Sequence, residues 1–183
     1  SVFGMQDFSF SNVQRWVSVS VAVGGAQPAE FPLLTLGAAV VDDPKQTFYC
    51  EFVPEPYVFN PETVETFFPL APAAKTMHHL GEHGTSLHKG AVLFHDWLSR
   101  FGEPGELVFA DWDACVSWPH VVNLFVQGGV DNPFVTNMID IRTLWLARQI
   151  FPTWSDLQYL RPPMLAPQYS LAYADEKAIS QTH

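Results

Sequence analysis

The chain has 183 residues, the size of one ordinary domain, and can enclose a core without disulfides or a structural metal. Hydrophobic residues make up 48% and charged residues 15% of the chain, which excludes a disordered or fibrous protein. The formal net charge of -10 opposes sequence-blind binding to phosphate backbones, which lysine and arginine drive. Acidic nucleases are still possible, because bound divalent metal offsets their carboxylates.

Cysteine content and hydropathy bear on the compartment. Only Cys50 and Cys115 are present, too few for a disulfide framework. The apolar stretches at residues 17–23 and 33–41 are shorter than a membrane span, and no targeting segment is visible. We therefore expect a cytoplasmic protein without a membrane segment.

The first part of the chain predicts three strands. Residues 16–23 alternate β-branched and small side chains and stop at Gly24, as a strand does. Two further strands are predicted at residues 33–41 and 47–53, with a turn between them at residues 42–45. Strands joined in this way form an antiparallel meander.

The second part predicts strands and helices in alternation after a proline-rich connection. Strands are expected at residues 106–110 and 138–141. Helices are expected at residues 87–101 and 118–126, and a third helix follows the strand at 138–141 and continues through residue 150. Residues 151–168 predict a loop, and a final helix is expected from Leu171 to the end. This order predicts an α/β domain with a mixed five-stranded sheet and helices on both faces, spanning residues 16–183 after an N-terminal arm at 1–15.

Several segments resemble the DEDDh 3'-5' exonucleases, a ribonuclease H-like group. Residues 34–38 match the Leu-Ser-Ile-Gly-Ala pattern that follows the family's Asp-x-Glu strand. Asp113, Ala114 and Trp118 match an Asn-Ala-x-Phe-Asp-Trp stretch. Residues 132–134 and 140–141 match Asn-Pro-Phe and Asp-Ile, and Ala172 and Asp175 match the final His-x-Ala-x-x-Asp motif. The resemblance implies a ribonuclease H-like fold.

The resemblance also implies that most of the catalytic residues are missing. The Asp and Glu of the first motif fall on Ser20 and Ala22, the Asp of the second falls on Ser117, and the catalytic His falls on Ser170. Asp175 alone is retained. Family members use carboxylates to hold two divalent ions at the scissile phosphate, and serine replaces neither a ligand charge nor a His base. We therefore predict no exonuclease activity by the family mechanism.

A rearranged metal site is the enzymatic alternative. It would use Asp111, Asp113, Asp140 and Asp175 to hold Mg or Mn, and no other cofactor is expected. The simpler interpretation makes Asp111 and Asp113 loop residues after a strand, and Asp140 the cap of the next helix.

A second candidate metal site lies in the His-rich segment at residues 78–95. His79, Glu82 and His83 form the H-x-x-E-H pattern of some zinc peptidases. That pattern needs a helix, and Gly81 and Gly84 disfavour one. We expect His79, Glu82 and His83 to lie in a solvated loop, and metal binding by residues 78–95 stays open.

Two further sets of residues have functional and structural interpretations. Cys115 and His120 are a candidate nucleophile and base, but core packing is the favoured interpretation. Five aromatic residues are candidates for stacking bases or contacting a partner, although most aromatics fill the interior: Phe3, Phe8, Phe10, Phe67 and Phe68.

The sequence thus favours an inactive exonuclease-like domain that acts through a protein partner or self-association. The alternatives are a binder of single-stranded nucleic acid that does not cut it, and a metal-dependent nuclease with a rearranged site.

Overall fold

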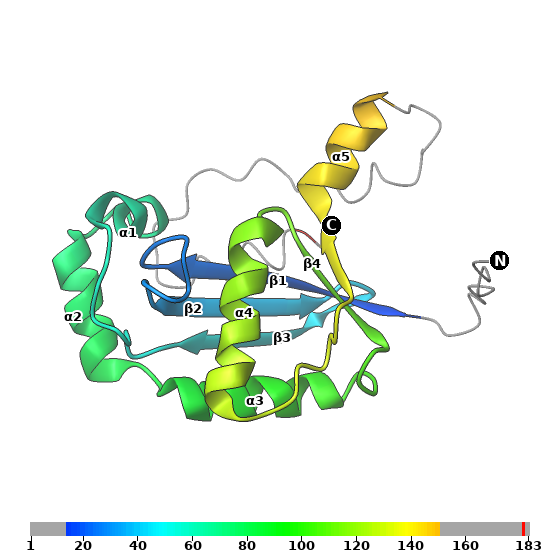
Figure 1. The fold of residues 1–183 in the computed structure, drawn as a ribbon, viewed down its shortest axis with the longest axis horizontal. Coiled ribbons are helices and arrows are strands. Elements are labelled where there is room, and N and C mark those ends of the chain that lie inside the picture. Colours follow the sequence, from blue (N-terminus) through cyan, green and yellow to red (C-terminus); the bar gives the residue numbers. More distant parts are fainter. Residues whose placement is uncertain (1–13, 151–180, 182–183) are drawn as a thin grey trace, which may run out of the picture.

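A mixed five-stranded sheet forms the centre of the computed structural model, which describes residues 14–150 and Gln181 (Figure 1). The strand order is β3-β2-β1-β4-β5. The meander consists of β1 (Arg15–Val23), β2 (Leu33–Val40) and β3 (Asp43–Glu51), paired antiparallel. The remaining strands, β4 (Leu107–Asp111) and β5 (Met138–Asp140), are added in parallel beside β1. The predicted meander and sheet are confirmed.

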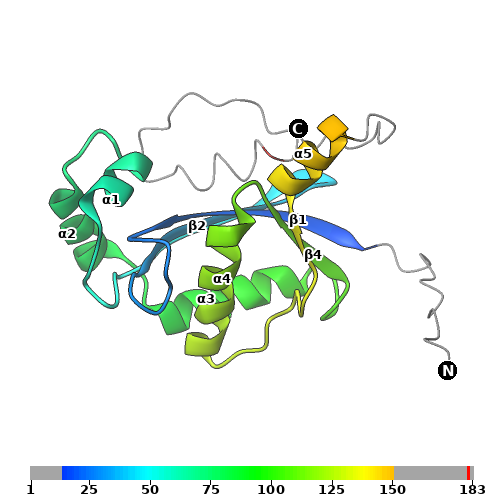
Figure 2. The same ribbon diagram turned by 45° about the horizontal axis from the view of Figure 1, so that its top comes forward.

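Helices α3 (Leu87–Ser99) and α4 (Ala114–Gly128) cover one face of the sheet (Figure 2). Two hydrophobic cores pack against the sheet, and the larger one lies on the side of α3 and α4. The alternate residues Val17, Val19 and Val21 of β1 point into this larger core. There they join Phe94 of α3 and Phe125 of α4, whose rings stack with centroids 5.7 Å apart. The period of two along β1 thus directs its valines to α3 and α4.

A second, smaller core lies on the other side of β1. Helices α1 (Pro61–Phe67) and α2 (Ala73–His83) lie together at one end of the sheet, while α5 (Ile141–Ile150) lies at the other (Figures 1 and 2). The smaller core joins α1 and α2 to β1 and β2. Its buried members are Ala22, Leu34, Val64, Phe68, Ala73, Met77 and Leu80. The prediction of helices on both faces is therefore confirmed.

Two expectations about the elements were wrong, and a third is not tested. Strand β3 starts at Asp43, within the expected turn, and Pro44 is tolerated because β3 is an edge strand. Helix α4 starts at Ala114, before the expected 118, and includes Pro119 in its second turn. The expected final helix from Leu171 lies outside the described residues.

Helices α1 and α2 were not predicted. Asn60 caps α1 by accepting hydrogen bonds from the backbone of Glu62 and Thr63, and Pro61 occupies the first helical turn. The His-rich segment expected as a loop forms much of α2. Burial of one face of α2, including Met77 and Leu80, outweighs the low helix propensity of Gly81. Among the described residues, no helix has both the length and the apolar character needed to cross a membrane.

Candidate functional site

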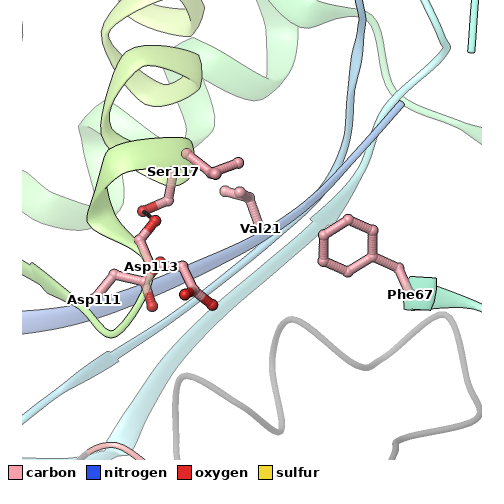
Figure 3. Close-up of a pocket in the computed structure, with 6 residues that line it drawn as sticks. Val21, Phe67, Asp111, Asp113 and Ser117 are labelled. Atoms are coloured by element: carbon pink, nitrogen blue, oxygen red, sulfur yellow. Dashed lines mark hydrogen bonds between the residues drawn. The ribbon is translucent and has the colours of Figure 1, made fainter. Parts of the chain in front are cut away.

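A cavity lies beside the carboxyl end of β4, where open α/β sheets commonly bind ligands. Its volume is about 80 Å³, and its lining comes from β1, α1, β4 and the start of α4. Figure 3 shows the lining residues, which are Val21, Phe67, Asp111, Asp113, Val116 and Ser117. The cavity therefore includes two of the predicted acidic candidates, Asp111 and Asp113, together with Ser117, which the resemblance places at a catalytic position.

Asp111 is the last residue of β4 and only 1% exposed, so the expected loop position was wrong. Its Oδ1 accepts a hydrogen bond of 3.0 Å from Nε2 of Gln181. The Oε1 of Gln181 accepts one of 3.2 Å from the backbone N–H of Trp112. The carboxamide of Gln181 thus hydrogen-bonds both to the buried Asp111 carboxylate and to the backbone N–H of Trp112. No sequence signal indicated this contact, because its partners are 70 residues apart.

The other two described acidic candidates have separate surroundings. Asp113 is half-buried at the start of α4, and its carbonyl accepts hydrogen bonds from the N–H and hydroxyl of Ser117. Asp140 directly precedes α5, and its Oδ2 accepts a hydrogen bond of 2.6 Å from the Thr143 hydroxyl. Asp113 lines the cavity with Asp111, whereas Asp140 is not in its lining. Asp175 lies outside the described residues.

The first-motif positions have surroundings unlike a metal site. Ser20 is fully buried, and its hydroxyl has no hydrogen-bond partner among the residues that the structure describes. Ala22 is fully buried in the apolar cluster with Leu34 and Met77. Neither residue lines the cavity, although Val21 between them does. Ser170 lies outside the described residues.

Among the described residues, Ser20, Ala22 and Ser117 do not supply the ligands that a pair of divalent ions needs. Such ions need several hard, charged oxygen ligands, but Ser20, Ala22 and Ser117 provide only two hydroxyls and a methyl group. The part of the chain that the structure describes contains no group of three His, Cys, Asp or Glu side chains arranged to hold a metal. Burial of Ala22 among apolar side chains further opposes a carboxylate at that position.

Cys115 and His120 do not form a nucleophile pair. Cys115 is exposed, which contradicts its expected core packing. His120 is buried, with Nε2 3.0 Å from the carbonyl oxygen of Gly25. Because a carbonyl only accepts, Nε2 carries the proton and donates. Burial lowers the pKa of His120 below its ordinary value, although hydrogen bonds to the backbone at Gly25 and Ala26 oppose that shift.

The remaining candidates divide between core and surface. Phe67 is half-buried and lines the cavity, whereas Phe68 is buried in the smaller core. Phe3, Phe8 and Phe10 lie outside the described residues. His79, Glu82 and His83 lie on α2 rather than in a loop.

Sequence comparison relates the chain to a known nuclease. The chain is 26% identical over 131 residues to the 3'-5' DNA exonuclease Cap18 of Escherichia coli, covering 71% of this chain and 67% of that protein. This similarity supports the resemblance to the DEDD-type 3'-5' exonucleases. No protein-family model matches this exonuclease-like domain.

Solved structures show the same fold. The exonuclease-like domain matches E. coli exonuclease I in a zinc-bound complex with single-stranded DNA, with a TM-score of 0.62 and 12% identity, covering 92% of this chain and 38% of that one. It matches apo exonuclease I with a TM-score of 0.61 and 13% identity, covering 92% of this chain and 41% of that one. The domain thus spans less than half of the exonuclease I chains. The predicted ribonuclease H-like fold is confirmed.

Proposed function

We propose that this exonuclease-like domain does not cut nucleic acid by the two-metal mechanism and acts through contacts with a protein partner or with a second copy. The observation that carries the proposal is the burial of Ala22 in an apolar cluster, at the position where the resemblance places a metal-binding glutamate. A carboxylate there would lose its hydration without gaining a charged partner. The surroundings of this position are therefore suited to core packing.

Charge favours a protein partner over nucleic acid. Asp111 and Asp113 both line the cavity beside β4, and the whole chain has a net charge of -10. Without metal to offset them, these carboxylates repel phosphate. The same charges are compatible with a basic protein surface, which supports the protein-binding proposal.

Cleavage of 5'-end-labelled single-stranded DNA and RNA with Mg²⁺ or Mn²⁺ tests the loss of activity. The E. coli relative Cap18 serves as the positive control for DNA, and Asp113→Asn and Asp175→Asn variants are purified alongside. We expect no shortening from the 3' end by the natural chain. Metal-dependent shortening that disappears in either variant would refute the proposal and identify a rearranged nuclease site.

Sedimentation equilibrium over a wide concentration range tests self-association. A concentration-dependent rise in mass would support contacts between copies. A chain that remains monomeric at the highest concentration restricts the proposal to a different protein partner.

Binding of single-stranded nucleic acid without cleavage is the second candidate. It is supported by the fold shared with exonuclease I, which has been solved in complex with single-stranded DNA, and by Phe67 at the cavity. Fluorescence anisotropy with a labelled oligonucleotide tests it. Affinity that falls steeply with salt and weakens in Phe67→Ala supports this candidate, whereas no binding at low salt refutes it.

A further inference from the structure

The cavity beside β4 combines two carboxylates with an apolar wall. Asp111 and Asp113 line it from the end of β4 and the start of α4, while Val21, Phe67 and Val116 contribute apolar side chains. In Figure 3 the two carboxylates lie on one side of Val21 and the Phe67 ring lies on the other. A ligand that matches this lining carries a positive charge and has apolar atoms next to it.

The lining residues differ in how far they are buried. Val21 and Asp111 are 4% and 1% exposed, whereas Phe67 and Asp113 are half-buried. The carboxylate of Asp113 and the ring of Phe67 are therefore reached from solution. A carboxylate has about four acceptor positions, so the hydrogen bond that Asp111 accepts from Gln181 is compatible with a further donor.

The charge of the cavity favours a cation. Among the described residues that line it, two are acidic and none is lysine or arginine. The N-terminus of α4 beside them carries only about half a positive charge, which does not offset two carboxylates. The net charge of -10 on the whole chain adds to the attraction for a cationic ligand.

The size of the cavity limits the cation that enters it. The volume of about 80 Å³ corresponds to roughly two to three water molecules at about 30 Å³ each. The last two methylenes and the ammonium of a lysine side chain make a group of about that size. The guanidinium of arginine is a larger, planar group. The volume therefore favours an ammonium group.

We infer that this cavity binds the ammonium end of a lysine side chain from a protein partner. The inference rests on the proposed function, because it names the chemistry by which the partner is recognised. The ammonium donates hydrogen bonds to Asp113 and Asp111, and its methylene stem packs against Phe67 and Val21. Four elements contribute to the lining, so the folded domain presents the site already formed.

NMR titration of the full, isotope-labelled chain with Nα-acetyl-lysine methylamide tests the site, without metal and at constant ionic strength. We expect shift changes at the amides of Asp113, Val116 and Ser117, with a dissociation constant on the order of 10 mM, because so small a group binds weakly. The apolar analogue Nα-acetyl-norleucine methylamide should bind at least about fivefold more weakly. Equal binding of the two compounds, or no shift changes at these amides, would overturn the inference.

A matched pair of variants locates the charge that binds the ammonium. The side chain of Asp113 makes no capping hydrogen bond to α4, so Asp113→Asn removes the charge without removing a cap. We expect it to weaken binding of the lysine compound at least about fivefold. Asp131→Asn removes the same charge from an exposed position beyond α4 and should leave the affinity unchanged. Unchanged affinity in Asp113→Asn, or an equal loss in Asp131→Asn, would contradict the inference.

Two further comparisons separate this inference from the alternatives. Metal-dependent shortening of nucleic acid would refute the proposed function, whereas a chain that neither cuts nor binds the lysine compound would refute only the lysine site. The free amine n-butylamine carries the same ammonium without a peptide backbone. Tighter binding of n-butylamine than of the lysine compound would assign the cavity to a free amine and overturn its assignment to a protein side chain.

Discussion

Asp111 and Asp140 are direct register partners at the carboxyl ends of the parallel strands β4 and β5, yet different neighbours hold their carboxylates. Gln181 donates to Asp111 at 3.0 Å, and Thr143 donates to Asp140 at 2.6 Å. Each side chain is thus oriented by its own hydrogen bond. Both carboxylates lie at the edge of the sheet where open α/β folds commonly bind ligands.

Replacing Gln181 with alanine is expected to destabilise the domain by about 1–3 kcal/mol, because it removes partners from a buried carboxylate and from the Trp112 N–H. Urea unfolding measures the change in the free energy of unfolding. Gln149→Ala removes the same side chain from an exposed position on α5 and should have little effect. Equal stability of the two variants would show that the Gln181 contact contributes nothing.

A glutamate at position 22 tests whether the first-motif surroundings accept a carboxylate. Ala22→Glu should destabilise the domain at pH 7 by several kcal/mol more than Ala22→Gln, which has nearly the same shape without the charge. Denaturant unfolding of both variants gives the difference. The gap should narrow at acid pH, where the new carboxyl is protonated. If Ala22→Glu and Ala22→Gln were equally stable at pH 7, position 22 would still accommodate the carboxylate of a metal ligand.

Two glycines near the end of α2 should respond to alanine in opposite directions. Gly84→Ala places a methyl group against the backbone of Phe52 and Val53 and should destabilise the domain by at least ~1 kcal/mol. Gly81→Ala meets no atom within 4 Å and should stabilise the helix by roughly 0.5–1 kcal/mol. Thermal unfolding separates these effects. A stabilised Gly84→Ala would contradict the close approach of α2 to β3.

His120 should make stability depend on pH in the mildly acidic range. Burial lowers its folded-state pKa, so below pH about 6.5 the unfolded chain takes up a proton that the folded chain still resists. Stability therefore rises with pH, and the His120 contribution is lost as pH falls from about 6.5 towards the folded pKa. His120→Gln should flatten this slope in unfolding experiments between pH 5 and 7. The exposed-site variant His88→Asn should retain it; an unchanged slope in His120→Gln would contradict this assignment.

Elements whose signal is local were predictable from the sequence. Alternating valines predicted β1, and apolar spacing with a following glycine predicted α3. The assignment of Ser20, Ala22 and Ser117 to catalytic positions of the family rests on the resemblance and stays a prediction. The absence of a carboxylate at these positions is visible in the sequence itself.

Features that depend on tertiary contacts were not predictable. Helix α2 forms because Met77 and Leu80 bury against the smaller core, an effect that propensity at Gly81 does not reveal. Asp111 was expected in a loop, but it is the last residue of β4 and pairs with Asp140 of β5, a contact that the local sequence does not reveal. Cys115 lies in the first turn of α4, on the side of the helix that faces away from the core, and which side faces the core depends on tertiary packing.

Counting bound Mn²⁺ by electron paramagnetic resonance tests most directly whether the cavity beside β4 has lost the two-metal centre. The natural chain is titrated with Mn²⁺ beside Asp113→Asn and Asp175→Asn, and the signal of free Mn²⁺ gives the number of ions bound. We expect indistinguishable titrations for all three proteins. Two ions bound by the natural chain, with either ion lost in one of these variants, would contradict the account.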